Sequence, residues 1–333
     1  MELVFYYLAE GGGKALFAFF FLIGLYIVWK GAVLLRDRLV YKKQAPEPIK
    51  ALGWGVLELV IFFGGVFVVL GYLLVWVNSA AQPEVVLRNS AILMELDQAL
   101  FGSYVPFWVQ AIGSPVRGVI SLLSPLIIEV YQNLVLATSL VFTVALIRSQ
   151  HLFREVFLAF ILSILVCLPF WYLVPALTPL DAYWKGRVSA PYYSETSVAM
   201  ANYQPSSALA AVIGERALMP QPVPLVVTTF PSLHVALSVV VLIYGALLWL
   251  PLLWVLVPYF LLNAIATVVL LQHYAVDVPA GILVGLVAVG LARLVGRRWK
   301  TSNSMNMSDM IRADLTQLGV IWKGMFRRSH MRK

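Results

Sequence analysis

The chain has 333 residues, of which 61% are hydrophobic and 12% are charged, with a formal net charge of +8. A soluble domain carries about twice that charged fraction, so the composition excludes an ordinary soluble protein and indicates an integral membrane protein. The single cysteine, Cys167, excludes a disulfide framework within the chain. No recognition motif accompanies the positive charge, so we expect no nucleic-acid partner.

Seven apolar segments reach the roughly 20 residues that a helix needs to cross a bilayer. In chain order they lie at about 15–36, 53–77, 119–147, 152–176, 232–250, 252–271 and 275–296. Only the turn at Leu250-Pro251 separates the fifth from the sixth, which predicts a helical hairpin. We therefore predict an all-α, polytopic membrane helical bundle with six or seven transmembrane spans.

The third segment differs from the others because it contains the polar residues Glu129, Gln132 and Asn133. It is expected to begin as an interfacial or buried polar stretch. Its polar side chains either line a substrate path or form hydrogen bonds between helices.

Basic residues set the predicted orientation. They cluster in 36–50, in 148–154 and after residue 292, which fall on one side of the membrane if the chain has seven spans. That side should be cytoplasmic, and the protein is expected to be a multi-pass protein of the cell membrane. We predict one transmembrane domain over 1–300, with its core at 119–296, and a basic cytoplasmic tail at 301–333.

Two long connections, at about 78–118 and 177–231, lie on the opposite, extracytoplasmic side in this topology. Long connections are usually functional or disordered. The first has an amphipathic pattern, so we expect it to lie in the membrane interface.

Two strings with histidines stand at the ends of apolar segments: Phe230-Pro231-Ser232-Leu233-His234 and His273-Tyr274-Ala275-Val276-Asp277. An ionisable group there is costly unless it has a function. On a helix His273 and Asp277 share one face, where a carboxylate fixes the imidazole tautomer and stabilises its cation. Both strings begin a span on the extracytoplasmic side, so His234 should meet this pair.

These residue types suit phosphoryl transfer at a membrane surface. A neutral His273, oriented by Asp277, would attack phosphorus and form a phosphohistidine. His234 would protonate the leaving group and then activate the acceptor. Ser232, near a helix N-terminus, would contribute to an anion site, and Tyr274 joins it among the predicted substrate-binding residues. The scheme needs no metal and no cofactor, and it makes the transmembrane domain catalytic.

The two strings resemble the second and third signatures of the type 2 phosphatidic acid phosphatase superfamily. The forms Pro-Ser-Leu-His and His-Tyr-x-x-Asp are similar to the inositol-phosphorylceramide synthase and sphingomyelin synthase branch. The segment Asp97-Gln98-Ala99-Leu100-Phe101-Gly102 also resembles an early part of that branch. The strong resemblance covers 230–285. It implies a helical bundle with an interfacial site, and the same roles for the two histidines and their aspartate.

The chain departs from the superfamily in its phosphate-binding cations. It contains no Arg-Pro dipeptide, so the first signature is absent. The arginine expected six residues before the third-signature histidine falls at Thr267, and the synthase branch lacks it too. Lys185 and Arg187, in the second outer connection, are our candidates for neutralising the phosphate. The alternative is a solvated pair that faces the lipid headgroups.

The sequence thus predicts a membrane-embedded lipid phosphotransferase or phosphatase that acts on a phospholipid or lipid phosphate at the extracytoplasmic face. Membrane lipids would be its partners as substrates, and a homo-oligomer is compatible with the sequence. One alternative is a non-enzymatic transporter or lipid-binding protein, which vanadate sensitivity would distinguish. Another is a metal or haem protein that uses His234 and His273 as ligands, which an absorption spectrum would identify.

Overall fold

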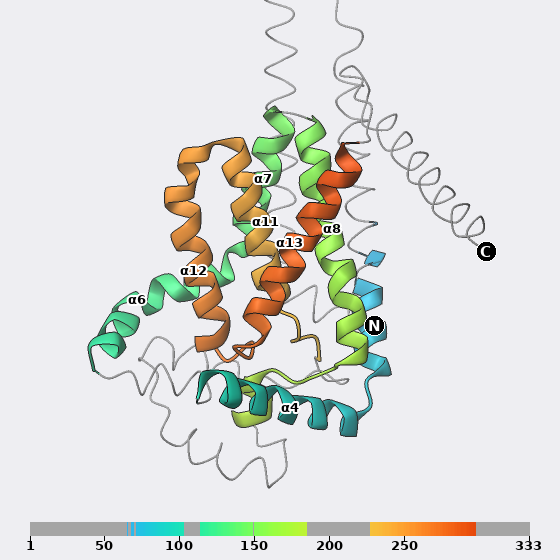
Figure 1. Cartoon of the computed structure of the whole chain (residues 1–333), viewed down its shortest axis with the longest axis vertical. Coiled ribbons are helices and arrows are strands. Elements are labelled where there is room, and N and C mark those ends of the chain that lie inside the picture. The colour runs from blue at the N-terminus through green and yellow to red at the C-terminus, as the bar shows by residue number, and fades with distance from the viewer. Residues whose placement is uncertain are drawn as a thin grey trace, which may run out of the picture.

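The computed structural model describes residues 71–102, 114–148, 150–184 and 227–297, with the single positions 65, 68 and 69. These residues form a helical bundle with one helix lying across its end (Figure 1). The helices are α4 (Pro83–Phe101), α6 (Ser114–Gln132), α7 (Leu134–Arg148), α8 (Gln150–Leu173), η1 (Leu180–Trp184), α11 (Leu233–Leu248), η2 (Leu250–Leu252), α12 (Leu253–Val269) and α13 (Asp277–Gly296). The predicted segment 15–36, most of 53–77 and the tail 301–333 lie outside the described residues.

The described helices are consistent with a membrane protein. Three of them are long and apolar enough to cross a bilayer, namely α8, the continuous η2 and α12, and α13. The hairpin predicted at Leu250-Pro251 is confirmed, because η2 joins α11 to α12 there. α11 is apolar but has only 16 residues, which is short for a span. The described residues thus form an all-helical fold with three candidate spans, or four with the bent pair described next, and the predicted total of six or seven spans stays a prediction.

The predicted segment 119–147 forms two helices, α6 and α7, that meet at an angle of 54° rather than one continuous helix. α7 stands in the bundle, whereas α6 runs outward from it (Figure 1). The side chains of Tyr259 and Asn263 in α12 donate to the Val130 carbonyl, at 3.2 and 3.3 Å, and hold the bend against that helix. Asn133 donates to the Glu129 side chain at 2.6 Å, so this polar pair bonds within one turn rather than between helices.

Two glycines let α13 approach α11 closely. A Cβ added at Gly281 would lie 2.5 Å from the Ser232 carbonyl oxygen, and one at Gly285 would lie 2.7 Å from the Ala236 oxygen. Small residues four apart allow such close backbone packing between membrane helices. The contact fixes the start of α11 beside the start of α13.

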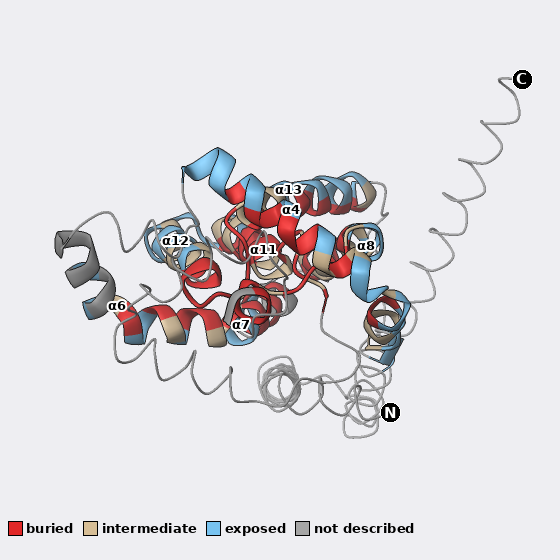
Figure 2. Cartoon of the chain, turned by 90° about the horizontal axis from the view of Figure 1, so that it is seen from below, coloured by how far each residue is buried: buried red, intermediate tan, exposed pale blue. Residues whose placement is uncertain are grey.

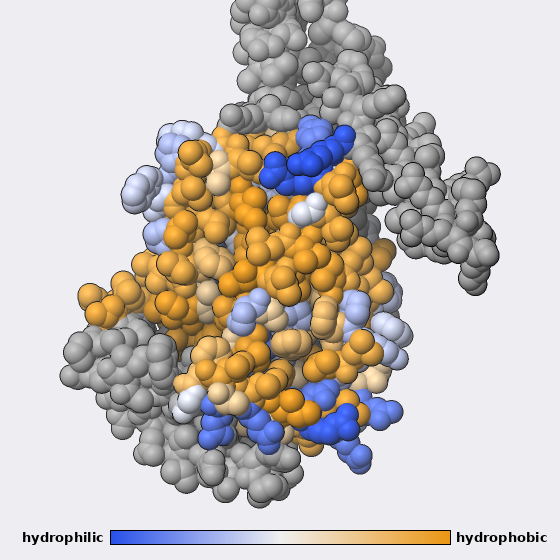
Figure 3. Space-filling model, viewed as in Figure 1, coloured by the Kyte–Doolittle hydropathy of each residue, from blue (hydrophilic) through white to orange (hydrophobic). Residues whose placement is uncertain are grey.

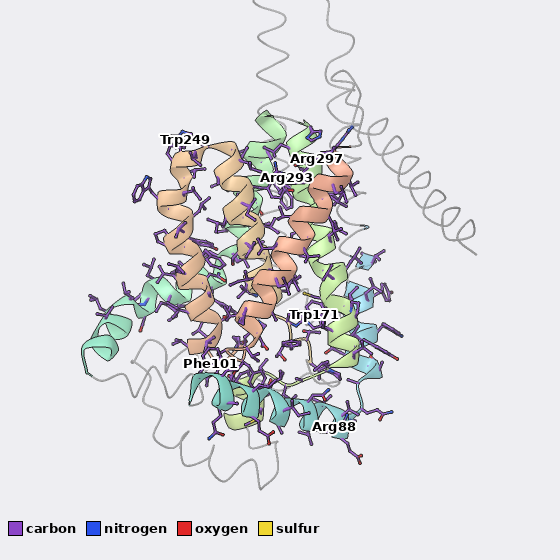
Figure 4. All side chains as sticks on the ribbon, in the orientation of Figure 1. Arg88, Phe101, Trp171, Trp249, Arg293 and Arg297 are labelled. Atoms are coloured by element: carbon purple, nitrogen blue, oxygen red, sulfur yellow. The ribbon has the colours of Figure 1, made fainter. Side chains whose placement is uncertain are left out.

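Hydrophobic side chains cover most of the height of the bundle, and the most hydrophilic residues gather near its two ends (Figure 3). Trp249 and Trp254 are exposed at the hairpin end, where Figure 4 labels the first of them. Trp76 and Tyr172 are also exposed, and their rings stack at 5.2 Å. Exposed tryptophan and tyrosine are typical of the membrane–water interface.

α4 lies across the end of the bundle opposite the α11–α12 hairpin (Figures 1 and 2). One face is buried against the bundle and includes Val86, Met94 and Asp97. Beside it runs an exposed apolar stripe of Ile92, Leu96 and Leu100. The charged residues Glu84, Arg88 and Glu95 occupy a third, exposed sector. This arrangement matches the amphipathic pattern predicted in 78–118 and suits a helix at an interface.

Candidate active site

Both histidine motifs lie at the end of the bundle that α4 covers. α11 and α13 both begin there, with His234 in the first turn of α11 and His273 in the turn before α13 (Figure 1). The ring centroids of the two histidines are 6.5 Å apart. The structure therefore brings together His234, His273 and Asp277, which the sequence separates by as many as 43 positions.

The hydrogen bonds of His273 define its tautomer. Its Nδ1 lies 3.0 Å from the Thr229 carbonyl oxygen and 3.1 Å from Asp277 Oδ2. Both partners are acceptors, so Nδ1 must carry the proton that it donates to them. In the neutral ring this leaves the lone pair on Nε2. His273 is thus arranged to present Nε2 as a base or nucleophile.

Burial favours the neutral ring. His273 is only 8% exposed, and desolvation lowers its pKa to about 4, although the bond to the Thr229 carbonyl opposes the shift. A neutral imidazole is the form that attacks phosphorus. Asp277 is fully buried, and its Oδ2 also accepts the Tyr274 backbone N–H at 3.0 Å.

Ser232 and Tyr274 have structural roles at the site: one caps a helix and the other packs in the core. Ser232 is fully buried and caps α11, because its Oγ accepts the Val235 N–H at 3.3 Å. Its own N–H donates to the Asp277 carbonyl and ties the two motifs together. Tyr274 is 1% exposed in an apolar cluster with Met94, and burial raises the pKa of its phenol well above 10. Direct contact of either side chain with a substrate stays a prediction.

Tyr131 is a neighbour of His234 that the sequence did not reveal. The two rings stack almost parallel, 9° apart, with centroids at 4.2 Å. An aromatic face stabilises a cation that lies on it, so the stack favours the protonated imidazole. Tyr131 lies in the last turn of α6, just before the bend. No motif marks this tyrosine, since its position depends on the bend.

Asp97 is a second residue whose place in the site the sequence did not show. Its carboxylate comes from α4 and accepts the backbone N–H groups of Ala275 and Val276, each at 2.9 Å. Asp97 is 2% exposed, and burial raises its pKa to about 6. One feature of the sequence could have indicated this role. Asp97 follows Leu93 and Met94 at helical spacing, so its carboxylate lies on the face of the helix that otherwise packs into the core.

The site has no arginine at the position where the superfamily expects one. Thr267 stands there, fully buried, and its carbonyl accepts the N–H groups of Gln272 and His273 at 3.1 and 3.0 Å. Its role is therefore to shape the turn that carries His273. Within the described ranges no group of three or more His, Cys, Asp or Glu side chains could hold a metal ion.

Three of the four arginines whose side chains are described lie at the end of the bundle opposite the histidines, and the fourth, Arg88, lies on α4. Figure 4 places Arg293 and Arg297 at the far end of α13, and Arg88 on α4. Arg154 lies in the first turn of α8, beside His151, whose Nε2 is 3.1 Å from the Gly296 carbonyl at that same far end.

Lys185 and Arg187 lie outside the described residues. The segment that leads to them is anchored near the site, because the Leu180 N–H of η1 donates to the Leu271 carbonyl at 2.9 Å. Leu271 lies two residues before His273 in the chain.

A model of the PAP2 superfamily matches residues 91–291, well over half of the chain. The chain belongs to the PAP2 superfamily. The matched range contains both histidine motifs and Asp97, so it extends well beyond the 55 or so residues of the strong motif resemblance. No curated protein and no solved structure matches the chain. The superfamily assignment is therefore confirmed, while the synthase-like branch stays a prediction.

Proposed function

We propose that this PAP2 superfamily protein is a lipid phosphotransferase or phosphatase that works through a phosphohistidine on His273. The observation that carries the proposal is the pair of acceptors at His273 Nδ1, which leaves Nε2 free to attack. Membership of the superfamily supports a phosphatase-type reaction on a lipid phosphate or phospholipid.

The two histidines divide the chemistry between them. In the first step Nε2 of His273 forms a bond to phosphorus, the bond from phosphorus to the leaving oxygen breaks, and His234 gives that oxygen a proton. In the second step the now neutral His234 takes a proton from water or a lipid hydroxyl. That oxygen bonds to phosphorus, and the N–P bond to His273 breaks. Asp277 stabilises the positive charge that the His273 ring carries in between.

The cations that we propose to balance the phosphate charge lie in the second outer connection, at about 177–231. Lys185 and Arg187 follow closely after η1, whose first residue is bonded to the turn before His273. The N-terminus of α11, capped by Ser232, supplies a favourable helix dipole in the same place.

An extracytoplasmic site is supported by the distribution of charge. Arg293 and Arg297 lie at the end of the bundle opposite the histidines, and the sequence continues after them with further basic residues. Basic residues concentrate on the cytoplasmic side of membrane proteins, which supports a site on the other face of the cell membrane.

Transfer to a lipid hydroxyl, as in the inositol-phosphorylceramide synthase-like branch, is our preferred reaction. His273 is 8% exposed, and α4 covers the end of the bundle where it lies. A site that limits the entry of water protects a reactive phosphohistidine from hydrolysis and favours transfer.

The test is product formation by the purified protein in mixed lipid vesicles that contain phospholipids, lipid phosphates and a lipid alcohol. We expect His273→Ala to abolish turnover and His151→Ala, the same change at the far end of the bundle, to retain it. A new phospholipid indicates transfer, and free phosphate indicates hydrolysis. Vanadate should inhibit the wild-type protein. Unchanged turnover in His273→Ala would overturn the mechanism, and no turnover on any lipid would favour a carrier.

A further inference from the structure

The start of α13 has no side-chain cap from its own N-cap residue. Val276 occupies the N-cap position of α13, and no side chain of that residue bonds to the helix. The N–H groups of Ala275 and Val276 point instead to the two oxygens of Asp97, one amide to each oxygen, at 2.9 Å. A carboxylate at a helix N-terminus satisfies free amides and complements the helix dipole. Here that carboxylate comes from a different helix.

The choice of a carboxylate fits this geometry. Asp97 is 2% exposed, and a buried charge is costly unless strong hydrogen bonds compensate for it. Two acceptor oxygens match two donors, whereas an asparagine would offer one acceptor and turn a donor toward the second amide. The side chain is therefore specific for holding two adjacent N–H groups.

α4 is also linked by hydrogen bonds to the segment that supports Thr229, the other hydrogen-bond partner of His273 Nδ1. Asn89 of α4 donates to the Pro175 carbonyl at 3.1 Å, and Ser90 accepts the Leu177 N–H at 2.9 Å. Between these positions, the Ala176 carbonyl accepts the Thr229 hydroxyl at 3.1 Å. The Thr229 carbonyl is the acceptor that faces His273 Nδ1. The same helix thus supports the site from two directions.

We propose that Asp97 is a positioning residue, which holds the 274–276 turn so that His273 and Asp277 stay aligned and Nε2 faces the substrate. The proposal rests on the phosphohistidine function proposed above. Asp97 touches neither substrate nor reacting atoms, and it acts through the two amides that precede α13.

The experiment combines kinetics with hydrogen–deuterium exchange on the full-length protein in lipid vesicles. Asp97→Asn is compared with Glu95→Gln, which makes the same carboxyl-to-amide change at an exposed site on the same helix. We expect Asp97→Asn to lower kcat by about 100-fold with KM unchanged, since a misplacement of about 1 Å has that effect. Exchange in the peptide over 271–280 should accelerate by about tenfold or more, with α11 peptides unaffected. Glu95→Gln should behave as wild type in both.

Three results would overturn the proposal. The first is wild-type kcat in Asp97→Asn. The second is rapid exchange at Ala275 and Val276 already in the wild-type protein. The third is loss of protection throughout α11 and α13 in the variant, which would make Asp97 a general stabiliser. If the wild type turns over no lipid, the proposed function fails, whereas the exchange data still decide whether Asp97 holds the turn.

Discussion

Gly281 sets the distance between the two helices that carry the histidines, so a single methyl group there should disable the enzyme. In Gly281→Ala the new Cβ would lie 2.5 Å from the Ser232 carbonyl oxygen and 3.0 Å from the Val235 Cβ. Ordinary contact begins at 3.4 Å, so the helices must separate by about 0.9 Å. The oxygen belongs to backbone that accepts the Ala236 N–H, and it cannot rotate away as a side chain would.

A shift of that size should affect turnover more than folding. Overpacking of this kind costs about 1–3 kcal/mol of stability. Moving His234 away from His273 by about 1 Å should lower kcat by about 100-fold. The assay is lipid-product formation in vesicles, with thermal unfolding in detergent measured on the same samples.

Gly290→Ala is the matched control, because the same helix carries this glycine and a Cβ there would meet nothing within 4 Å. It should keep wild-type turnover and be equally or slightly more stable, since alanine favours a helix over glycine by up to about 1 kcal/mol. Wild-type kcat in Gly281→Ala would refute the claim that the close approach of α11 and α13 sets the site. Equal losses in both variants would refute it as well.

Three further predictions concern the side chains around His273. Asp277→Asn keeps the shape of the side chain but removes the charge that orients and stabilises the His273 ring, so kcat should fall by about 10³–10⁴-fold. Steady-state kinetics would measure this, and an activity near wild type would contradict it. The pKa of Asp97 is raised to about 6, by burial first and also by the Asp277 charge, so acidification through pH 6 neutralises the acceptor of the turn and activity should fall. Asp97→Asn should remove that limb from the pH profile of kcat/KM, so that the remaining fall on the acid side lies near pH 4, where His273 becomes protonated. Tyr131→Leu should lower kcat by about tenfold, because it removes the ring that stacks on His234. Tyr131→Phe keeps that ring and should lower kcat less, and equal effects in kinetic assays would contradict this.

Much of the site could be predicted from local patterns. The i, i+4 spacing predicted that Asp277 contacts His273, although α13 begins only at Asp277 and the contact is made across the turn before it rather than on one helix face. The order of the apolar segments predicted that His234 lies at the same end. Hydropathy also indicated the hairpin at Leu250-Pro251, because a proline after an apolar run ends one helix and allows the next to begin. These are properties of adjacent residues, so the sequence alone carries them.

The remaining features depend on contacts between distant residues. Asp97 meets Ala275 across 178 positions, and nothing local in α4 indicates which amides its carboxylate will accept. The bend between α6 and α7 is held by Tyr259 and Asn263 in α12, so the sequence of 119–147 by itself suggested a single segment. The stacking of Tyr131 on His234 follows from that bend.

The most direct test of the central claim is to identify the atom that carries phosphorus during turnover. The wild-type protein and His273→Ala would each be mixed with a radiolabelled phospholipid donor, and the reaction would be quenched with alkali during turnover. The quenched protein would then be digested and examined by mass spectrometry. A phosphohistidine at Nε2 of His273, absent from the variant, is the predicted result, because Nδ1 is committed to Thr229 and Asp277. Phosphate found at Nδ1 of His273 or on another residue would contradict this mechanism. Turnover of lipid with no phosphorylated residue would contradict it as well.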